Sequence, residues 1–241
     1  MILIFRKQTA VLAALLVGLS IGLLRAFPLS GWDPVPTLSP IPAEVRVVID
    51  PGHGGEDGGA VSPDGLPESG LNLEISRMLR DLLVLSGQAV TMTRSDDSSL
   101  DNGEATVRGR KAADLRARVE LVNRSKPAVL LSIHQNSLPA SPVTHGAQAF
   151  WNLQPGAEKL AQAIQDDLNR CANPGNEKHT RQIPTAVYLM RHCMAPGVLV
   201  ECGFLSNAEE TQRLGDSIYQ RKLAAAIGAG YLRWAAGEEP I

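Results

Sequence analysis

The fold class of this chain follows from the stretch Arg46-Val-Val-Ile-Asp-Pro-Gly-His-Gly-Gly-Glu-Asp-Gly-Gly59, in which an apolar, β-branched run ends in Asp50. The run predicts a buried strand, and the glycine-dense loop after it presents His53 at the carboxyl end of that strand. In an open α/β sheet, ligands bind at this edge. The stretch therefore predicts a central strand with a histidine at the functional edge of a sheet.

Short β-branched runs alternate with longer amphipathic segments from residue 45 onward. Strands are predicted at Val45–Asp50, Ala89–Thr93, Ala128–Ile133, Ala147–Trp151, Ala186–Met190 and Val198–Glu201. Helices are predicted at Leu71–Leu85, from Asp114 as the capping residue, from Gly156 to Asn169 and from Ile218 to Ala235. The alternation predicts an α/β fold, a single domain with a mostly parallel, roughly six-stranded twisted sheet flanked by helices on both faces.

Residues 1–27 differ in kind from the rest of the chain. Arg6 and Lys7 precede an uncharged apolar run from Thr9 to Leu24, which is typical of an export signal or a membrane anchor. The run is short for a spanning helix, which needs about 17–25 residues, yet no clear small-x-small cleavage site follows it. We favour an uncleaved anchor with its basic end inside; a cleaved signal and a buried core helix are the alternatives. A signal or an anchor implies an extracytoplasmic protein.

The composition of the other 214 of the 241 residues predicts three further segments and argues against some kinds of partner and site. Recurring prolines predict a semi-rigid spacer over residues 28–44, ahead of a catalytic domain at 45–237 and a tail at 238–241. The net charge of −2 gives no basic footprint, so we expect no nucleic-acid partner. Cys171, Cys193 and Cys202 have no CxxC spacing, which argues against a disulfide scaffold or a thiolate zinc site. We expect them to be buried as small hydrophobic residues.

Three metal-competent side chains stand beside predicted strand ends or a helix start. His53 follows the first strand, Glu68 immediately precedes the first helix, and His134 follows the third strand. Two histidines and a carboxylate, with a fourth position open, form the usual ligand set of a hydrolytic zinc site. Imidazole also favours zinc over magnesium. No HExxH helix supplies these ligands, so the fold must assemble them. The alternative for His134 is a satisfied core histidine.

Glu201 is a fourth candidate, because it ends the last predicted strand. A charge at a buried strand end is costly unless it is paired or functional. Glu201 therefore either takes part in the chemistry or forms an ion pair with an arginine such as Arg94. Asp50 either orients His53 or caps the loop, and Asn136 donates either to a substrate or to the loop backbone.

Several motifs occur in a fixed order along the predicted domain: Val48-Ile-Asp-Pro-Gly-His-Gly-Gly55, Glu68 with Asn72-Leu73, Met92-Thr-Arg94, Ser132-Ile-His-Gln-Asn-Ser137, Pro196 and Val200-Glu-Cys-Gly-Phe-Leu-Ser-Asn207. From Val45 to Tyr231 the chain resembles the zinc-dependent N-acetylmuramoyl-L-alanine amidases, the type-3 family of bacterial cell-wall hydrolases. The short domain behind an apolar N-terminus looks most like the germination-specific, CwlD-type amidases of spores. Ser69, the turn Arg191-His-Cys-Met194 and the segment from Cys171 to Ile183 depart from the family pattern.

The resemblance implies His53, Glu68 and His134 as Zn²⁺ ligands and Glu201 as the catalytic carboxylate. The implied enzyme hydrolyses the amide bond between N-acetylmuramic acid and L-alanine in peptidoglycan. With such a substrate, we expect the loop glycines to clear a shallow groove for a glycan strand beside His53.

A CwlD-type role implies removal of stem peptides from the spore cortex, as the first step of muramic-δ-lactam formation in the space between the forespore membranes. The partners implied are a downstream deacetylase and a sporulation activator protein. A general vegetative autolysin of the same family is one alternative, and a non-catalytic wall-binding relative is another.

Overall fold

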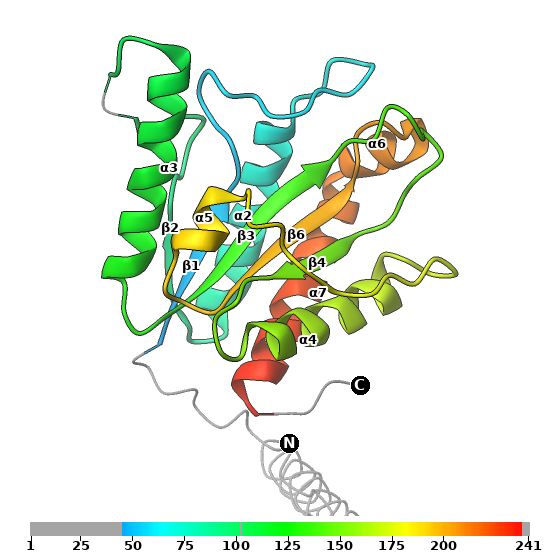
Figure 1. Cartoon of the computed structure of the whole chain (residues 1–241). Helices are drawn as coiled ribbons and strands as arrows, with labels where there is room; N and C mark the ends of the chain where they lie inside the picture. The colour runs from blue at the N-terminus through cyan, green and yellow to red at the C-terminus, as the bar shows by residue number, and fades with distance from the viewer. Residues whose placement is uncertain (1–44, 102, 238–241) are drawn as a thin grey trace, which may run out of the picture. The chain divides into compact units, whose positions relative to one another are not determined.

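The sheet of this protein has six strands in the computed structural model, which describes residues 45–101 and 103–237 (Figure 1). The strands are β1 (Arg46–Pro51), β2 (Ala89–Met92), β3 (Ala128–Asn136), β4 (Gln148–Trp151), β5 (Arg181–Gln182) and β6 (Gly197–Phe204). Their order across the sheet is β2-β1-β3-β6-β4-β5, and only the β4–β6 pair is antiparallel. The predicted mostly parallel sheet is confirmed. The predicted anchor, spacer and tail lie outside the described residues.

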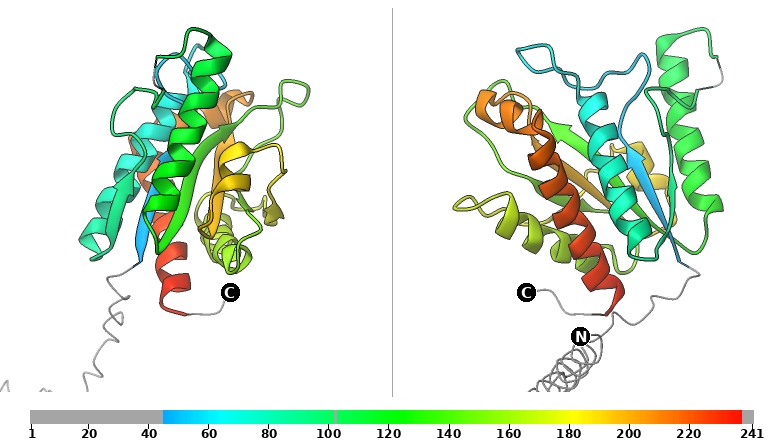
Figure 2. Two further views of the ribbon diagram at one scale, coloured as in Figure 1. Left: turned by 60° about the vertical axis from the view of Figure 1, so that its left-hand side comes forward. Right: turned by 180° about the vertical axis from the view of Figure 1, so that it is seen from behind.

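Helices cover both faces of the sheet (Figure 1; Figure 2). The first face carries α2 (Glu68–Leu85), α4 (Ala157–Cys171) and α7 (Ser217–Ala235), the second carries α3 (Val107–Arg124) and α5 (Tyr188–His192), and α6 (Ala208–Leu214) follows β6. Successive side chains of a strand point to opposite faces. Val47 and Ile49 of β1 accordingly enter the core under α2 and α7, whereas Val48 enters the core under α3 and α5. β1 is therefore a central strand that is buried on both sides, as the sequence predicts.

The predicted strand at Ala186–Met190 is wrong. The short helix α5 occupies Tyr188–His192 instead. The edge strand that completes the sheet is β5, which has only two residues and precedes α5 in the chain. Leu189 and Met190 are buried in the core of the second face. A short apolar run buries its side chains equally well as a strand or as a helical turn, so periodicity alone does not separate the two.

The predicted start of the second helix is also wrong. α3 begins at Val107, and the side chain of Thr106 caps it by accepting a hydrogen bond from the Gly109 amide at 3.0 Å. Asp114 lies inside this helix and contacts Arg118, with 2.7 Å between Oδ2 and Nε. The first turn of α3 is rich in charged residues and its one apolar side chain, that of Val107, is exposed, so the turn has no buried apolar face that would mark it as helical. α2 likewise begins at Glu68 itself, not after it.

The three cysteines are free thiols. Cys193 and Cys202 are buried, as predicted for small hydrophobic residues, whereas Cys171 is half-buried. Within residues 45–101 and 103–237, no helix has both the length and the apolar character that a membrane-spanning helix needs.

The carboxyl ends of β1, β3 and β6 meet at one edge of the sheet because these three strands are parallel neighbours. In the register of the sheet, Asp50 lies beside Ser132, and His134 lies beside Glu201. The loop that carries His53 leaves β1 at the same edge. The topology therefore brings together residues that are up to 148 positions apart, the separation between His53 and Glu201.

Candidate metal and catalytic site

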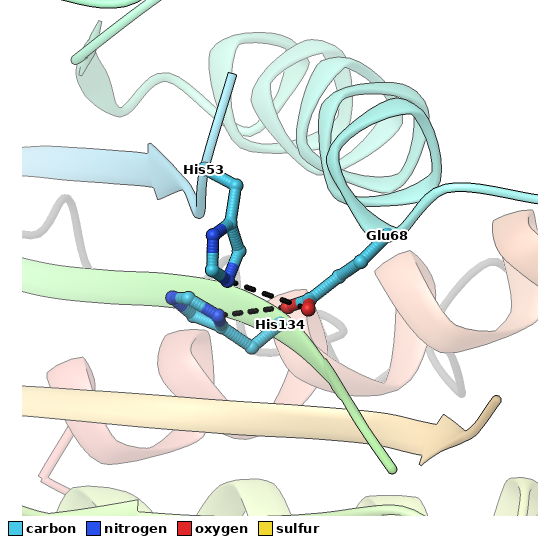
Figure 3. Close-up of side chains that lie close together, drawn as sticks. All are labelled: His53, Glu68 and His134. Carbon is cyan, nitrogen blue, oxygen red and sulfur yellow. Dashed lines mark hydrogen bonds and ion pairs between the residues drawn. The ribbon is translucent and has the colours of Figure 1, made fainter. Parts of the chain in front are cut away.

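Three side chains from separate elements converge at this edge of the sheet (Figure 3). The Nε2 atom of His53 lies 3.3 Å from Oε2 of Glu68, and the Nδ1 atom of His134 lies 2.9 Å from Oε1 of Glu68. One ligand-type atom from each residue lies within 4.8 Å of the other two. The ring centroids of the two histidines are 5.1 Å apart. The structure thus brings together the three residues that the sequence predicts as metal ligands.

Glu68 is held as a buried carboxylate at the first position of α2, where it is 3 % exposed. Its oxygens accept hydrogen bonds from the backbone amides of Ala60 and Gln135, at 2.9 and 3.0 Å. Burial alone would raise the pKa of Glu68, but hydrogen bonds and charges from His134 and His53 hold it far below its ordinary value. The amino end of a helix also favours a negative charge. Glu68 is therefore charged at neutral pH and able to bind a cation.

His53 is the only non-glycine residue with a positive φ in the described part of the chain, at 61°. Such a backbone costs roughly 1–2 kcal/mol for a residue with a Cβ, and it persists only where the surroundings hold it. The His53 carbonyl accepts a hydrogen bond from Arg118 Nη2 at 2.7 Å, and the ring Nδ1 lies 3.0 Å from Oδ2 of Asp57. Burial lowers the pKa of His53, but Glu68 and Asp57 together raise it above its ordinary value.

Two glycines leave room for the ligand side chains. A Cβ added to Gly59 would lie 2.5 Å from Oε2 of Glu68 and 2.8 Å from Cδ2 of His53. A Cβ added to Gly52 would lie 2.2 Å from the His134 ring. The side chains of Glu68, His53 and His134 fill the space beside these two glycines. At Gly52 and Gly59 that space is therefore not the groove for a glycan strand that the sequence predicts.

Glu201 lies beside His134 in the register of β3 and β6. The residue is half-buried, and its Oε2 atom is buried with no hydrogen-bond partner among the described residues. Burial raises the pKa of Glu201 to about 7, the nearby His134 lowers it, and Glu68 raises it. A buried polar atom without a partner is uncommon in folded proteins. Glu201 is thus a carboxyl group that can both hold and release a proton near neutral pH.

The alternative in which Glu201 pairs with Arg94 is wrong. Among the residues that the structure describes, the Arg94 guanidinium donates only to backbone carbonyls, those of Pro51, Gly52, Ser69 and Asp96. These bonds tie the loop after β1 to the first turn of α2. Arg94 therefore holds the two segments that carry His53 and Glu68, and it contacts neither carboxylate of the site.

Asp50 contacts the loop indirectly. Its oxygens accept hydrogen bonds from Thr93, Ser132 and Arg118, each at 2.7 Å, and the ring of His53 is not among these partners. Asn136 uses its Oδ1 to accept a hydrogen bond from the Ser137 amide at 2.8 Å, and its backbone carbonyl accepts from Leu205. Asn136 thus stabilises the local backbone around the site, whereas Asp50 binds side chains, among them Arg118, which in turn binds the His53 carbonyl.

Sequence reasoning missed two residues that support His53. Asp57, the residue beside the His53 ring, stands four positions later in the same loop, and a carboxylate at that spacing was the available signal. Arg118 is 2 % exposed, although it belongs to a helix rich in charged residues. Nothing in the sequence of α3 separates this buried arginine from its exposed neighbours.

A cavity opens beside the two histidines on the face covered by α3 and α5. Its apolar wall comes from Leu115, Val187 and Met190, whereas Lys111 and Tyr188 bring polar groups. Because His53 and His134 also line it, a molecule bound in this cavity would contact the candidate metal site directly.

The model of the N-acetylmuramoyl-L-alanine amidase family matches residues 47–232 of this chain. The germination-specific N-acetylmuramoyl-L-alanine amidase of Bacillus subtilis (strain 168) is 42% identical over 190 residues, which are 78% of this chain and 78% of that protein. A solved structure of the CwlD amidase from Clostridioides difficile, in complex with the GerS lipoprotein, is 35% identical with a TM-score of 0.77 and covers 80% of this chain and 99% of that one. An N-acetylmuramoyl-L-alanine amidase from Clostridium difficile 630 gives a TM-score of 0.69 at 29% identity, over 79% and 96% of the two chains.

Proposed function

This chain belongs to the family of N-acetylmuramoyl-L-alanine amidases, and from that premise we propose that it is a zinc-dependent hydrolase that cleaves the amide bond between N-acetylmuramic acid and L-alanine in peptidoglycan. The observation that carries the proposal is the convergence of His53, Glu68 and His134 within 4.8 Å, with Glu201 beside His134 on the next strand. Residues 45–237 form the proposed catalytic domain. The presence of all four chemical groups argues against a wall-binding relative that has lost its activity.

The donor set of the site fits zinc. Two imidazoles and one carboxylate are the protein ligands of many catalytic zinc sites, which leave a fourth position open for water or substrate. The carboxylate of Glu68 faces both imidazoles, and a Cβ at Gly52 or Gly59 would collide with these side chains. We therefore assign His53, Glu68 and His134 as the residues that hold the ion.

Glu201 is the proposed general base and general acid. Zinc, when bound, supplies a Lewis acid that polarises the amide carbonyl and makes an attacking water easier to deprotonate. Glu201 accepts the proton of that water and later donates it to the amino group of L-alanine as the C–N bond breaks. A pKa of Glu201 near neutrality suits both transfers, since the group must hold and release a proton at the same pH.

The proposed biological role is removal of stem peptides from the spore cortex, ahead of a deacetylase that completes muramic-δ-lactam. The support is the likeness to the germination-specific amidase of B. subtilis and to the CwlD amidase of C. difficile. The C. difficile protein was solved with a lipoprotein, GerS, so we propose a lipoprotein activator for this chain too. The proposed location is extracytoplasmic, in the space between the forespore membranes, with residues 1–27 as the anchor.

Mass spectrometry of purified sacculi incubated with the protein tests the proposed reaction. We expect free stem peptides that begin with L-alanine and glycan strands that lack peptides, and we expect a chelator to abolish both products. Addition of Zn²⁺ to the chelated protein should restore them. Products cut within the glycan strand or within the stem peptide, or products that persist in chelator, would contradict the proposed reaction or its zinc dependence.

Complementation separates the cortex role from that of a general autolysin. A sporulating host that lacks its own germination-specific amidase would express this chain during sporulation, and its cortex muropeptides would be measured. Restored muramic-δ-lactam would support the cortex role. A cortex without δ-lactam, in a host where the protein is active on sacculi, would favour the vegetative alternative.

A further inference from the structure

We infer that Asp57 is a positioning residue that fixes the ring of His53 for metal binding, an inference that rests on the proposed zinc site. Oδ2 of Asp57 lies 3.0 Å from Nδ1 of His53, while Nε2 of the same ring faces Glu68 at 3.3 Å. A neutral imidazole whose Nδ1–H is bound to a carboxylate has its lone pair on Nε2. The contact with Asp57 therefore selects the tautomer in which the nitrogen that faces Glu68 is the metal-binding one.

The carboxylate of Asp57 is itself held from several directions. Its Oδ1 atom accepts a hydrogen bond from the Gly59 amide at 3.2 Å, and the Lys111 ammonium of α3 lies 3.0 Å from Oδ2. The backbone of Asp57 exchanges two hydrogen bonds with Gly54, at 2.8 and 3.2 Å. These backbone hydrogen bonds close a tight turn from Gly54 to Asp57. Asp57 therefore has a fixed position relative to the imidazole ring of His53.

Asp57 also restrains a residue that is under strain. His53 has a positive φ of 61°, and Arg118 binds its carbonyl while Asp57 binds its ring. One contact therefore fixes the backbone of His53 and the other fixes its χ angles. Loss of Asp57 would leave the backbone in place and free the ring to turn away from Glu68 and His134.

Glu56 provides a matched control for a substitution of Asp57. The two acidic residues are adjacent in the same loop, but Glu56 is exposed and pairs with Arg110, with 2.6 Å between Oε2 and Nη2. Asp57→Asn and Glu56→Gln therefore remove the same charge at nearly the same place. Only Asp57→Asn weakens the contact with His53.

The test is the zinc dissociation constant of the full chain in detergent, measured by competition with a chelator for wild type, Asp57→Asn and Glu56→Gln. We expect Asp57→Asn to weaken zinc binding roughly 10- to 100-fold, the usual effect of losing the hydrogen-bond partner of a ligand histidine. We expect Glu56→Gln to match wild type. Equal zinc affinities for the two variants would overturn the inference. A wild-type protein that binds no zinc would instead overturn the proposed zinc site itself.

Two further readouts separate positioning from general stability. In the zinc-loaded wild type, ¹⁵N chemical shifts of His53 should show a protonated Nδ1, and Asp57→Asn should weaken or lose that proton signal. Thermal unfolding of the metal-free proteins should give Asp57→Asn the same midpoint as Glu56→Gln. A lower midpoint for metal-free Asp57→Asn, with an unchanged His53 spectrum, would mean that Asp57 only stabilises the loop and would contradict the inference.

Discussion

Asp50 and Arg118 form a buried ion pair, with 2.7 Å between Oδ1 and Nη1 and both side chains 2% exposed. Arg118 extends from this pair to the carbonyls of Pro51 and His53, at 2.8 and 2.7 Å. The Arg118 guanidinium thereby joins three elements: the end of β1, the helix α3 and the loop that carries His53. The geometry of the candidate metal site thus depends on a charge pair that makes no hydrogen bond to the imidazole ring of His53 or His134.

Asp50→Asn is expected to destabilise the fold strongly. Removal of one partner from a buried ion pair typically costs about 3–5 kcal/mol, because the remaining charge stays buried. Asp114 also binds Arg118, so we expect the lower end of that range, about 3 kcal/mol. Denaturant unfolding of the metal-free protein measures the change. Glu74→Gln, which breaks an exposed pair with Arg77, is the control and should cost less than about 1 kcal/mol.

The stability contributed by Asp50 should disappear in acid. Burial raises the pKa of this carboxyl, but Arg118, the hydroxyls of Thr93 and Ser132 and the nearby His134 together outweigh burial and hold the pKa below its ordinary value. A depressed folded-state pKa gives stability that is present above the unfolded-state value, about 3.9, and lost as the pH falls through the folded-state value. The gap in unfolding free energy between wild type and Asp50→Asn should therefore narrow below about pH 4. A gap that stays constant from pH 7 to pH 3 would contradict this assignment.

Gly59→Ala should disrupt the site more than it disrupts the fold. The Cβ would collide with Glu68 and His53, and φ is +70° at this position. Gly65→Ala is a matched control, because φ is +84° there and nothing lies within 4 Å of the added Cβ. Both variants should lose roughly 1–2 kcal/mol of stability from the left-handed backbone, whereas only Gly59→Ala should lose zinc affinity. Isothermal titration with zinc, beside denaturant unfolding, distinguishes the two effects.

Glu201→Gln should keep the metal and lose the reaction. The amide occupies nearly the volume of the carboxylate but cannot accept a proton, so we expect kcat on sacculi to fall roughly 10²- to 10⁴-fold. Zinc content by elemental analysis should stay equal to that of wild type, because His53, Glu68 and His134 are untouched. Full activity in this variant would remove Glu201 from the proposed chemistry.

Zinc should raise the melting temperature of the protein. A ligand at 100 times its dissociation constant adds about 2.7 kcal/mol to the stability of the folded state, which corresponds to roughly 5–10 °C for a protein of this size. Differential scanning calorimetry with zinc and with chelator measures the shift. His134→Ala should abolish it, and a shift of the same size in that variant would exclude His134 as a ligand.

The sequence predicts most of the sheet because the central strands are buried on both faces. β1, β3 and β6 read as continuous β-branched and apolar runs, so their position and parallel arrangement follow from composition and from the helices between them. Prediction failed where that signal is weak. The apolar run Ala186–Met190 is too short to distinguish the two-residue period of a strand from the 3.6-residue period of a helix. The first turn of α3 has no buried apolar face that would identify it as helical.

The sequence by itself determined which residues are the candidates for the chemistry. The sequence places His53, Glu68, His134 and Glu201 at predicted strand ends or a helix start, and parallel strands bring such ends to one edge of a sheet. In the structure β3 and β6 continue past His134 and Glu201, to Asn136 and Phe204, but both residues lie in the carboxyl-terminal halves of their strands. Side-chain type and position along the chain are sufficient for that step.

Only the tertiary structure decided what holds those residues in place. Asp57 beside His53, Arg118 between Asp50 and the loop, and Arg94 on backbone carbonyls all depend on atomic distances between segments. The physical reason is that a local sequence fixes backbone preference and burial pattern, whereas the partner of a buried charge is set by packing between elements far apart in the chain. The sequence likewise did not show why glycine is needed at positions 52 and 59. The reason is that the His134 ring packs against Gly52 and the Glu68 and His53 side chains pack against Gly59, which only the tertiary structure shows.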